Sequence, residues 1–237
     1  LKLAKERGNA PWIHKTKWVE GWLPIDTYKK SVDELTTEPN HYDWENLRTR
    51  ILAQGGIGHS VLCNLMPTES SSKASGMPNC YYPIRELAMK KSDQDNVIDW
   101  CAPDGDLLAD KYDLAYDTDT VEMTKFVAVG QKWCDQSFSA DSWRDRIKNP
   151  DITTDEMIEN FRAMIKYGKK SSYYQNSLIS EKQKATSSDQ VMNFLLEMHQ
   201  KDPANWPLPP ELMEKLTGQP VETEQQERAD CVGGCTL

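Results

Sequence analysis

The spacing of apolar residues changes along the chain. In the first three quarters of the sequence, helical spacing predicts several helices. One helix ends at Gly8, and the chain opens inside it with Leu1, so we expect the sequence to be a piece of a longer protein. A second helix begins after Asp43, whose side chain can cap it, and ends at Gly55. A third is expected at 120–133.

The most regular helical pattern lies between residues 153 and 168. Thr153 and Glu156 predict a capping box at its start, and Gly168 predicts its end. Between them the sequence predicts one apolar face, formed by Met157, Ile158, Phe161, Met164 and Ile165.

Strand patterns alternate with these helices. The apolar run at 59–66, bounded by glycine and by Pro67, predicts a buried parallel strand. Short strands are expected at 136–140 and 171–178, and a hairpin at 83–102 with its turn at 91–95. Because a strand, a helix and a strand follow in that order, the fold class is α/β with a parallel sheet.

The composition changes near residue 179 and divides the chain into 1–178, 179–220 and 221–237. The middle part is expected to form a short amphipathic helix after Ser188, and five of the thirteen prolines then lie between Pro203 and Pro220. The last part begins with an acidic stretch, 221–230, that is predicted to be disordered. A disordered link would let the terminus sweep a wide volume.

Charge and cysteine usage narrow the class of protein. The chain has 28 basic and 37 acidic side chains and no basic block, which argues against nucleic acid as a partner. It has no transmembrane run and no signal peptide, so we expect the cytoplasm as its location, with no membrane partner. The four histidines show no metal-ligand spacing. Four scattered cysteines are expected to be buried small hydrophobes: Cys63, Cys80, Cys101 and Cys134.

Two further cysteines, Cys231 and Cys235, stand near the carboxyl terminus with Gly233 and Gly234 between them. A disulfide at a mobile terminus would stabilise almost nothing, which favours a redox-active dithiol on a flexible arm. A fortuitous pair and half of a zinc site remain as alternatives.

Two other motifs carry candidate chemistry. Residues 66–72 follow the predicted strand, and their free amides and hydroxyls at a helix start suit a phosphate group, although the chemistry alone favours an ordinary helix cap followed by a serine-rich loop. Tyr173 and Tyr174 are neighbours in a predicted strand, so their side chains should point to opposite faces. They are candidates for a radical path, or else core aromatics.

Six segments stand in the order seen in the large subunit of class I ribonucleotide reductase. They are 3–8, 23–30, 41–45, 65–71, 135–137 and 173–176. The chain resembles that family, in its enterobacterial and T4-like phage form, from residue 1 to about 178 and again at the terminal cysteine pair.

The resemblance implies the C-terminal part of a ten-stranded α/β barrel with a flexible C-terminal tail. It implies an oxidoreductase that reduces ribonucleoside diphosphates to deoxyribonucleotides for DNA synthesis by a radical mechanism. The loop that holds the substrate's diphosphate in that family matches Pro67, Thr68, Glu69, Ser70 and Ser71.

The resemblance also assigns the other motifs. Tyr173 and Tyr174 match the tyrosine pair that carries the radical from the small subunit toward the active-site cysteine. Cys231 and Cys235 match the dithiol that re-reduces the active-site disulfide and is recharged by thioredoxin or glutaredoxin. No cofactor is expected in this chain; a diiron–tyrosyl radical is expected in the small subunit, and ATP or dATP effectors on the N-terminal part of the large subunit.

Some family features do not occur in this sequence. The motif Asn-x-Cys-x-Glu, which carries the active-site cysteine, is missing, and Cys63 lies where the family needs none. Residues 76–85 depart from the family's pattern after the loop. The chain alone should therefore have no catalytic activity. It is expected to be part of a longer polypeptide, a product of a split gene in a host or phage, or a non-catalytic remnant that binds the small subunit or thioredoxin.

Overall fold

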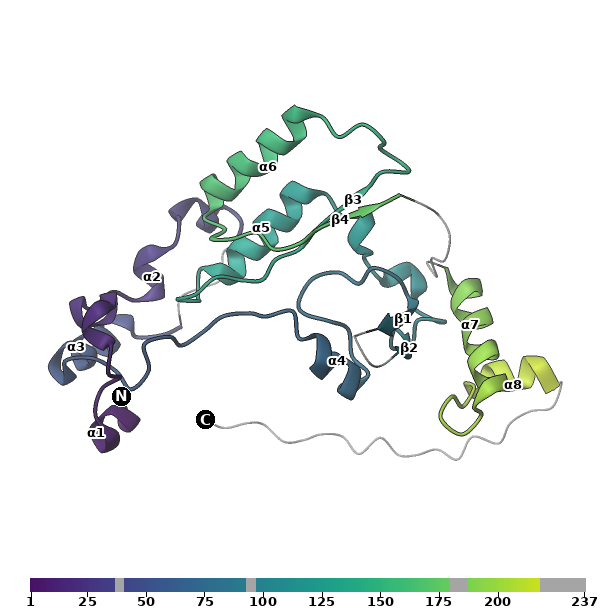
Figure 1. The fold of residues 1–237 in the computed structure, drawn as a ribbon, viewed down its shortest axis with the longest axis horizontal. Coiled ribbons are helices and arrows are strands. Elements are labelled where there is room, and N and C mark those ends of the chain that lie inside the picture. The colour runs from purple at the N-terminus through teal and green to yellow at the C-terminus, as the bar shows by residue number, and fades with distance from the viewer. Residues whose placement is uncertain (37–40, 93–96, 180–186, 218–237) are drawn as a thin grey trace.

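The computed structural model describes residues 1–36, 41–92, 97–179 and 187–217 (Figure 1). Its N-terminal region contains three short α-helices, α1 (Lys2–Arg7), α2 (Pro24–Thr27) and α3 (Trp44–Gln54), and three 3-10 helices, η1 (Ile13–Lys15), η2 (Lys17–Glu20) and η3 (Lys30–Glu34). The predicted ends are confirmed, because α1 stops at Gly8 and the Asp43 carboxylate accepts the amide of Asn46 at 2.9 Å. Ile13 of η1, Trp18 of η2 and Ile51 of α3 form one core with Leu23 and Ile57.

A strand–helix–strand unit forms the middle of the molecule. Strands β3 (Ser142–Asp145) and β4 (Gln175–Leu178) pair in parallel, and α6 (Thr154–Tyr167) connects them. Helix α5 (Thr120–Gln131) packs against α6 (Figure 1). The parallel α/β class is confirmed, as are the capping box of Thr153 and Glu156 and the left-handed Gly168 at the end of α6.

Helix α5 comes unusually close to the chain segment 134–140 because of one glycine. A Cβ atom at Gly130 would lie 2.7 Å from Cε2 of Phe138, so a larger residue there would force the ring or the helix to shift. Phe138 is buried with Val127, Cys134 and Ala140 beneath this helix. The glycine therefore lets the helix rest directly on the segment that leads into β3.

The predicted strands at 59–66 and 136–140 are wrong in extent. These segments meet in one parallel bridge, Leu65 with Phe138, and the regular strand begins later, at Ser142. The run at 59–66 is also exposed rather than buried, with Val61, Leu62 and Met66 each more than half accessible. An apolar run becomes a buried strand only when other elements cover it.

The barrel is not closed in this chain. Among the described residues the strands form two separate two-stranded sheets, β3 with β4 and β1 (Ala88–Ser92) with β2 (Val97–Cys101). The antiparallel pair β1–β2 confirms the expected hairpin, but Lys91 and Ser92 of the predicted turn belong to β1, and residues 93–96 lie outside the described residues. Two 3-10 helices, η4 (Ala109–Lys111) and η5 (Ala115–Asp117), follow it.

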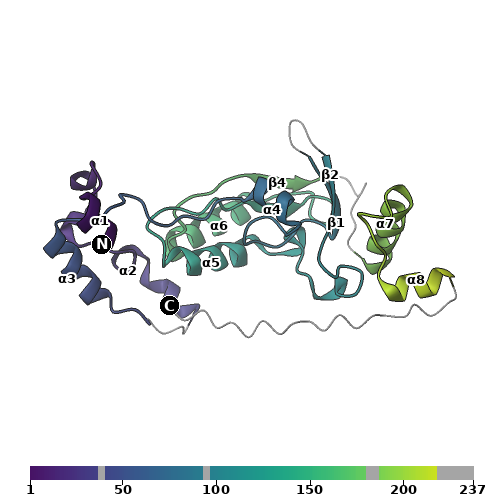
Figure 2. The same cartoon turned by 90° about the horizontal axis from the view of Figure 1, so that it is seen from below.

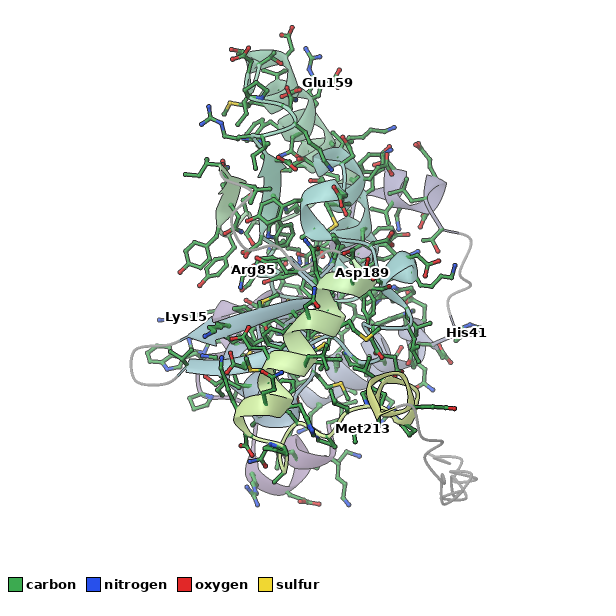
Figure 3. The ribbon with its side chains drawn as sticks, turned by 90° about the vertical axis from the view of Figure 1, so that its right-hand side faces the viewer. Lys15, His41, Arg85, Glu159, Asp189 and Met213 are labelled. Atoms are coloured by element: carbon green, nitrogen blue, oxygen red, sulfur yellow. The ribbon has the colours of Figure 1, made fainter. Side chains whose placement is uncertain are left out.

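Beyond residue 179 the chain forms α7 (Ser188–Lys201) and α8 (Pro210–Thr217). Helix α7 is the predicted amphipathic helix, and it packs against both strands of the hairpin (Figures 2 and 3). Val191 of α7 is fully buried in one core with Leu87 and Trp100 of the hairpin region. Helix α8 was not expected within the proline-rich stretch, but Pro210 occupies its first position, where proline is well tolerated.

The expected acidic link at 221–230 and the cysteines after it lie outside the described residues. Within the described ranges, every helix is too short or too polar to span a membrane.

Candidate functional site

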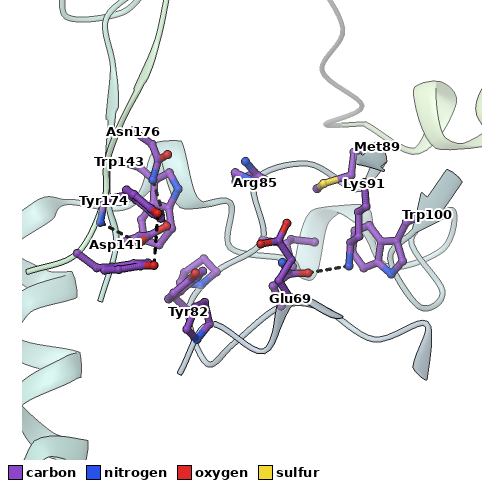
Figure 4. A pocket seen from close by; sticks show the side chains of 15 residues that line it. Glu69, Tyr82, Arg85, Met89, Lys91, Trp100, Asp141, Trp143, Tyr174 and Asn176 are labelled. Atoms are coloured by element: carbon purple, nitrogen blue, oxygen red, sulfur yellow. Dashed lines mark hydrogen bonds between the residues drawn. The ribbon is translucent and has the colours of Figure 1, made fainter. Parts of the chain in front are cut away.

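A cavity of about 280 Å³ lies where three distant parts of the chain meet. Pro67 and Glu69 contribute from the loop before α4 (Glu69–Ser75), and Tyr173 and Tyr174 contribute from the segment before β4. The hairpin closes a third side, as Figure 4 shows with Met89, Lys91 and Trp100 opposite Tyr174 and Asn176. The structure thus brings the predicted loop and the predicted tyrosine pair to one cavity.

The loop owes its shape to Thr68. This residue has a φ of +47°, which is rare outside glycine, and its Oγ1 accepts the amide of Cys80 at 2.8 Å. Ser72, one turn into α4, is buried and donates to the Glu69 carbonyl and to Oδ1 of Asn79. The bond to Asn79 ties α4 to the segment after it, while the bond to Glu69 lies within the helix. The other two predicted loop residues, Ser70 and Ser71, are exposed on α4.

The expectation that Tyr173 and Tyr174 point to opposite faces is wrong. Their ring centroids are 4.1 Å apart and their hydroxyls 3.4 Å apart. The two residues precede β4, where the amide of Tyr174 donates to the Asp141 carboxylate instead of a strand carbonyl. The regular alternation of a strand therefore starts only after them.

The contact between the two phenols has an electrostatic consequence. Tyr173 donates its hydroxyl to Tyr174, and the loss of that bond on ionisation raises the pKa of Tyr173. The Asp141 carboxylate anchors the chain at this point, because it accepts hydrogen bonds from the Tyr174 amide and from Nδ2 of Asn176, at 3.2 Å each. Both phenols are exposed enough to exchange protons with solvent.

Two cations at the cavity were missed by sequence reasoning, Arg85 and Lys91. Lys91 is buried, with its Nζ donating to the Met77 carbonyl at 3.1 Å and to Oδ1 of Asn79 at 2.8 Å, and it lies 4.1 Å from the centre of the Trp100 ring. Burial, together with the positive charge of Arg85, lowers the pKa of Lys91 to about 8. Strand alternation could have identified Lys91 as a buried residue, because it places Lys91 on the same face as the apolar Leu87 and Met89.

The cavity also contains an unused donor. Trp143 is 4% exposed, and its Nε1 finds no acceptor among the described residues. Its ring packs against Tyr82 with centroids 4.6 Å apart. A buried donor without a partner costs free energy, so a ligand that offers an acceptor here gains affinity. Figure 4 shows Trp143 beside Asp141 and Tyr174.

The cysteines divide into three groups. Cys231 and Cys235 lie outside the described residues. Cys134 is buried as expected, and Cys80 and Cys101 are partly buried. The expectation for Cys63 is wrong, because it is exposed on the segment at 59–66. The described part of the chain holds no cluster of three or more histidine, cysteine, aspartate or glutamate residues that would suit a metal ion.

Comparison with known proteins agrees with this architecture. Residues 1–104 match the family described as "Ribonucleotide reductase, barrel domain". Over 179 residues, 74% of this chain, the sequence is 37% identical to ribonucleoside-diphosphate reductase 1 subunit alpha of Salmonella typhimurium and to that of Escherichia coli. The subunit alpha of Enterobacteria phage T4 is 34% identical over 183 residues, 75% of the chain.

The chain spans about a quarter of the length of these relatives, 23% for the two enterobacterial subunits and 24% for that of the phage. The matches cover about three quarters of the chain. The chain belongs to the ribonucleotide reductase large-subunit family and carries part of its barrel domain.

Proposed function

We propose that this chain supplies three parts of a ribonucleoside-diphosphate reductase: a loop for the substrate's diphosphate, a tyrosine pair for radical transfer, and a terminal dithiol for re-reduction. One observation carries the proposal. The loop residues Pro67 and Glu69 and the phenols Tyr173 and Tyr174, far apart in the sequence, line one cavity. The relatives at 34–37% identity are named ribonucleoside-diphosphate reductase alpha subunits.

The charges around the cavity support a ribonucleoside diphosphate as the ligand. Arg85 and Lys91 offer positive charge beside the loop, and the Trp143 indole offers a free donor. Charge-assisted hydrogen bonds to phosphate oxygens are stronger than neutral ones, so the two cations would add affinity against the opposing negative charges of Glu69 and Asp141, which also line the cavity. Pro67, Thr68, Glu69, Ser70 and Ser71 would position the diphosphate.

The contact between Tyr173 and Tyr174 supports radical transfer. A phenol that loses an electron also loses its proton, and hydroxyls 3.4 Å apart let the proton and the hole move between neighbours. Asp141 fixes the pair at the cavity edge, which keeps this distance short. The radical would arrive from a small subunit, and the missing part of the large subunit would supply the active-site cysteine and the sites for ATP or dATP.

The first test uses an enzyme assembled from this chain, the remaining large subunit and the small subunit. Tyr173→Phe and Tyr174→Phe should each abolish turnover while binding of a ribonucleoside diphosphate stays unchanged, because phenylalanine keeps the ring but resists oxidation. Tyr42→Phe is the matched control, since Tyr42 is exposed and is not a cavity residue, and it should leave turnover intact. Turnover that survives in both relay variants would refute the relay.

A second test addresses the terminal dithiol. Cys231→Ser combined with Cys235→Ser should stop multiple turnovers driven by thioredoxin or glutaredoxin, whereas a small dithiol that reaches the active site directly should restore part of the rate. Full thioredoxin-driven activity in the double variant would remove the tail from the mechanism. Binding of the small subunit or thioredoxin, with no turnover under any condition, would favour the non-catalytic interaction module instead.

A further inference from the structure

Two cysteines that the proposed reaction does not use lie in contact with each other. The Sγ atoms of Cys63 and Cys134 are 3.2 Å apart, although 71 positions separate the residues in the sequence. Both are free thiols. The other two described cysteines behave differently, because the sulfurs of Cys80 and Cys101 point to the backbone carbonyls of Met66 and Ala102.

The backbone around the pair holds the two sulfurs together. The amide of Gln136 donates to the Cys63 carbonyl at 3.1 Å, and the amides of Leu62 and Cys63 donate to the Asp135 carboxylate at 3.1 and 2.6 Å. The two segments therefore run side by side like neighbouring strands, which are about 4.8 Å apart. The two Sγ atoms, 3.2 Å apart, need to move only about 1 Å to reach the length of a disulfide bond, about 2.05 Å.

We propose that Cys63 and Cys134 are a redox-modification site at which a reversible disulfide forms. Their surroundings assign different roles to the two thiols. Cys63 is exposed and meets the oxidant, whereas Cys134 is 6% exposed and reaches only Cys63. Burial and the neighbouring thiol raise the pKa of Cys134 to about 12, so the inner thiol stays protonated until the exchange reaches it.

The chemistry is a thiol–disulfide exchange with a small disulfide, for which oxidised glutathione is the probe. The Cys63 thiolate attacks one glutathione sulfur, the S–S bond of glutathione breaks, and one glutathione thiolate leaves. Cys134 then loses its proton to that thiolate or to water and attacks Sγ of Cys63, which expels the second glutathione. The two protein thiols lose two electrons and two protons, and the oxidised glutathione gains them.

The position of the pair gives the bond a structural consequence. Cys63 stands just before the loop that begins at Pro67, and the segment of Cys134 continues to Ala140, whose carbonyl accepts the Tyr173 amide at 3.0 Å. Lys170 braces the same segment by donating to the carbonyls of Cys134 and Asp135, at 3.0 Å each. The disulfide would therefore link the base of the loop covalently to the segment that holds the tyrosine pair.

The test is peptide mapping of the native chain after incubation with oxidised and reduced glutathione. Trypsin separates the four described cysteines into four peptides, 51–73, 74–85, 92–111 and 133–144, each with one cysteine. We expect 51–73 linked to 133–144, a link that dithiothreitol removes and that persists in the Cys231→Ser, Cys235→Ser background. The peptides that carry Cys80 and Cys101 should stay unlinked and serve as internal controls.

The same incubation in urea shows whether folding creates the link. In urea the link should fall to the level of the other cysteine pairings, because contact in the fold is then lost. If Cys63 and Cys134 alkylate independently in the native oxidised chain, or if Cys80 and Cys101 join links as often, the proposal is wrong.

Single variants test the order of the steps. Cys134→Ser should leave Cys63 carrying a glutathione adduct, and Cys63→Ser should leave Cys134 unmodified. A glutathione adduct on Cys134 in the Cys63→Ser variant would overturn the assignment of Cys63 as the entry point. Because the mapping of the unaltered chain decides on its own whether the disulfide forms, a variant that fails to fold does not affect that result.

Discussion

Helices α6 and α7 each span fourteen residues and begin with the same capping arrangement, yet solvent covers the apolar face of one and protein covers that of the other. Met157, Phe161 and Ile165 of α6 are 50–62% exposed. Val191 and Met198 of α7 are 0% and 2% exposed. An apolar stripe thus identifies a helix and one of its faces, but the rest of the fold decides whether that face is covered.

The face of α6 that packs is not the apolar one. Asn160 accepts a hydrogen bond from the buried Thr124 at 2.8 Å, and Ala163 and Tyr167 pack with Val32 and Ala128. Small and polar residues allow α5 and α6 to approach closely. Helix α7 instead inserts its apolar side chains between the residues of the hairpin core.

The two helices should differ most in the free energy of unfolding that is lost when a charge is placed on the apolar face. Val191→Asp should destabilise the chain by about 3 kcal/mol or more, because it leaves an unpaired carboxylate in an apolar core. Phe161→Asp, in the middle of α6, should cost less than about 1 kcal/mol. Urea unfolding, with hydrogen exchange of the α7 amides, measures both, and equal losses would show that the α6 face is covered.

Methionine occurs on the apolar faces of both helices, so truncating it to alanine compares them with a smaller expected loss of stability. Met198→Ala should cost about 2–3 kcal/mol, since it removes buried methylene groups and leaves a cavity. Met157→Ala should stay within about 0.5 kcal/mol, because its side chain is half exposed. Thermal unfolding of the two variants side by side is the measurement; if Met157→Ala lowers the midpoint as far as Met198→Ala, the contrast fails.

The helix starts should respond alike, because both are local. Thr153 accepts the amide of Glu156 at 3.2 Å, and Ser187 accepts the amide of Gln190 at 3.4 Å. Thr153→Ala and Ser187→Ala should therefore each cost about 1 kcal/mol, whatever covers the rest of the helix. Circular dichroism during urea unfolding checks this, with Thr153→Ser as the variant that keeps the cap.

The smallest effect concerns the hairpin under α7, where Lys91 is buried. Its folded pKa of about 8 lies below the ordinary lysine pKa of 10.5, so the unfolded chain binds more protons between these values. The free energy of unfolding should therefore rise with pH across this window in the wild type, relative to Lys91→Met, by under about 1 kcal/mol after solvent screening. A flat difference between the two proteins from pH 8 to 10 would contradict the lowered pKa.

Local sequence features predicted the helices and the hairpin well, for physical reasons. The caps at Asp43 and Thr153 act within one turn, so they do not depend on the rest of the fold. The hairpin requires only neighbouring strands, and its register, with Met89 opposite Trp100, follows from alternation. The strands at 59–66 and 136–140 failed because parallel pairing depends on distant partners.

The candidate site was predictable in part. The resemblance located the loop at 67–71 and the tyrosine pair, and the cavity contains members of both. The close contact of the Tyr173 and Tyr174 rings was not predictable from strand alternation, because the Asp141 carboxylate replaces a backbone acceptor there. The buried Lys91 was missed for a different reason: the prediction placed it in the turn at 91–95, where a charged side chain is expected to face solvent.

The docking of α7 on the hairpin also sets an order of events on the ribosome. Leu87 and Trp100 are synthesised about 90–105 residues before Val191, which packs with them in one core. At roughly 5–20 residues per second, the nascent chain displays the apolar side of the hairpin for roughly 5–20 seconds. During that interval a chaperone that recognises apolar segments can bind the hairpin, and α7 must displace it before the domain is complete.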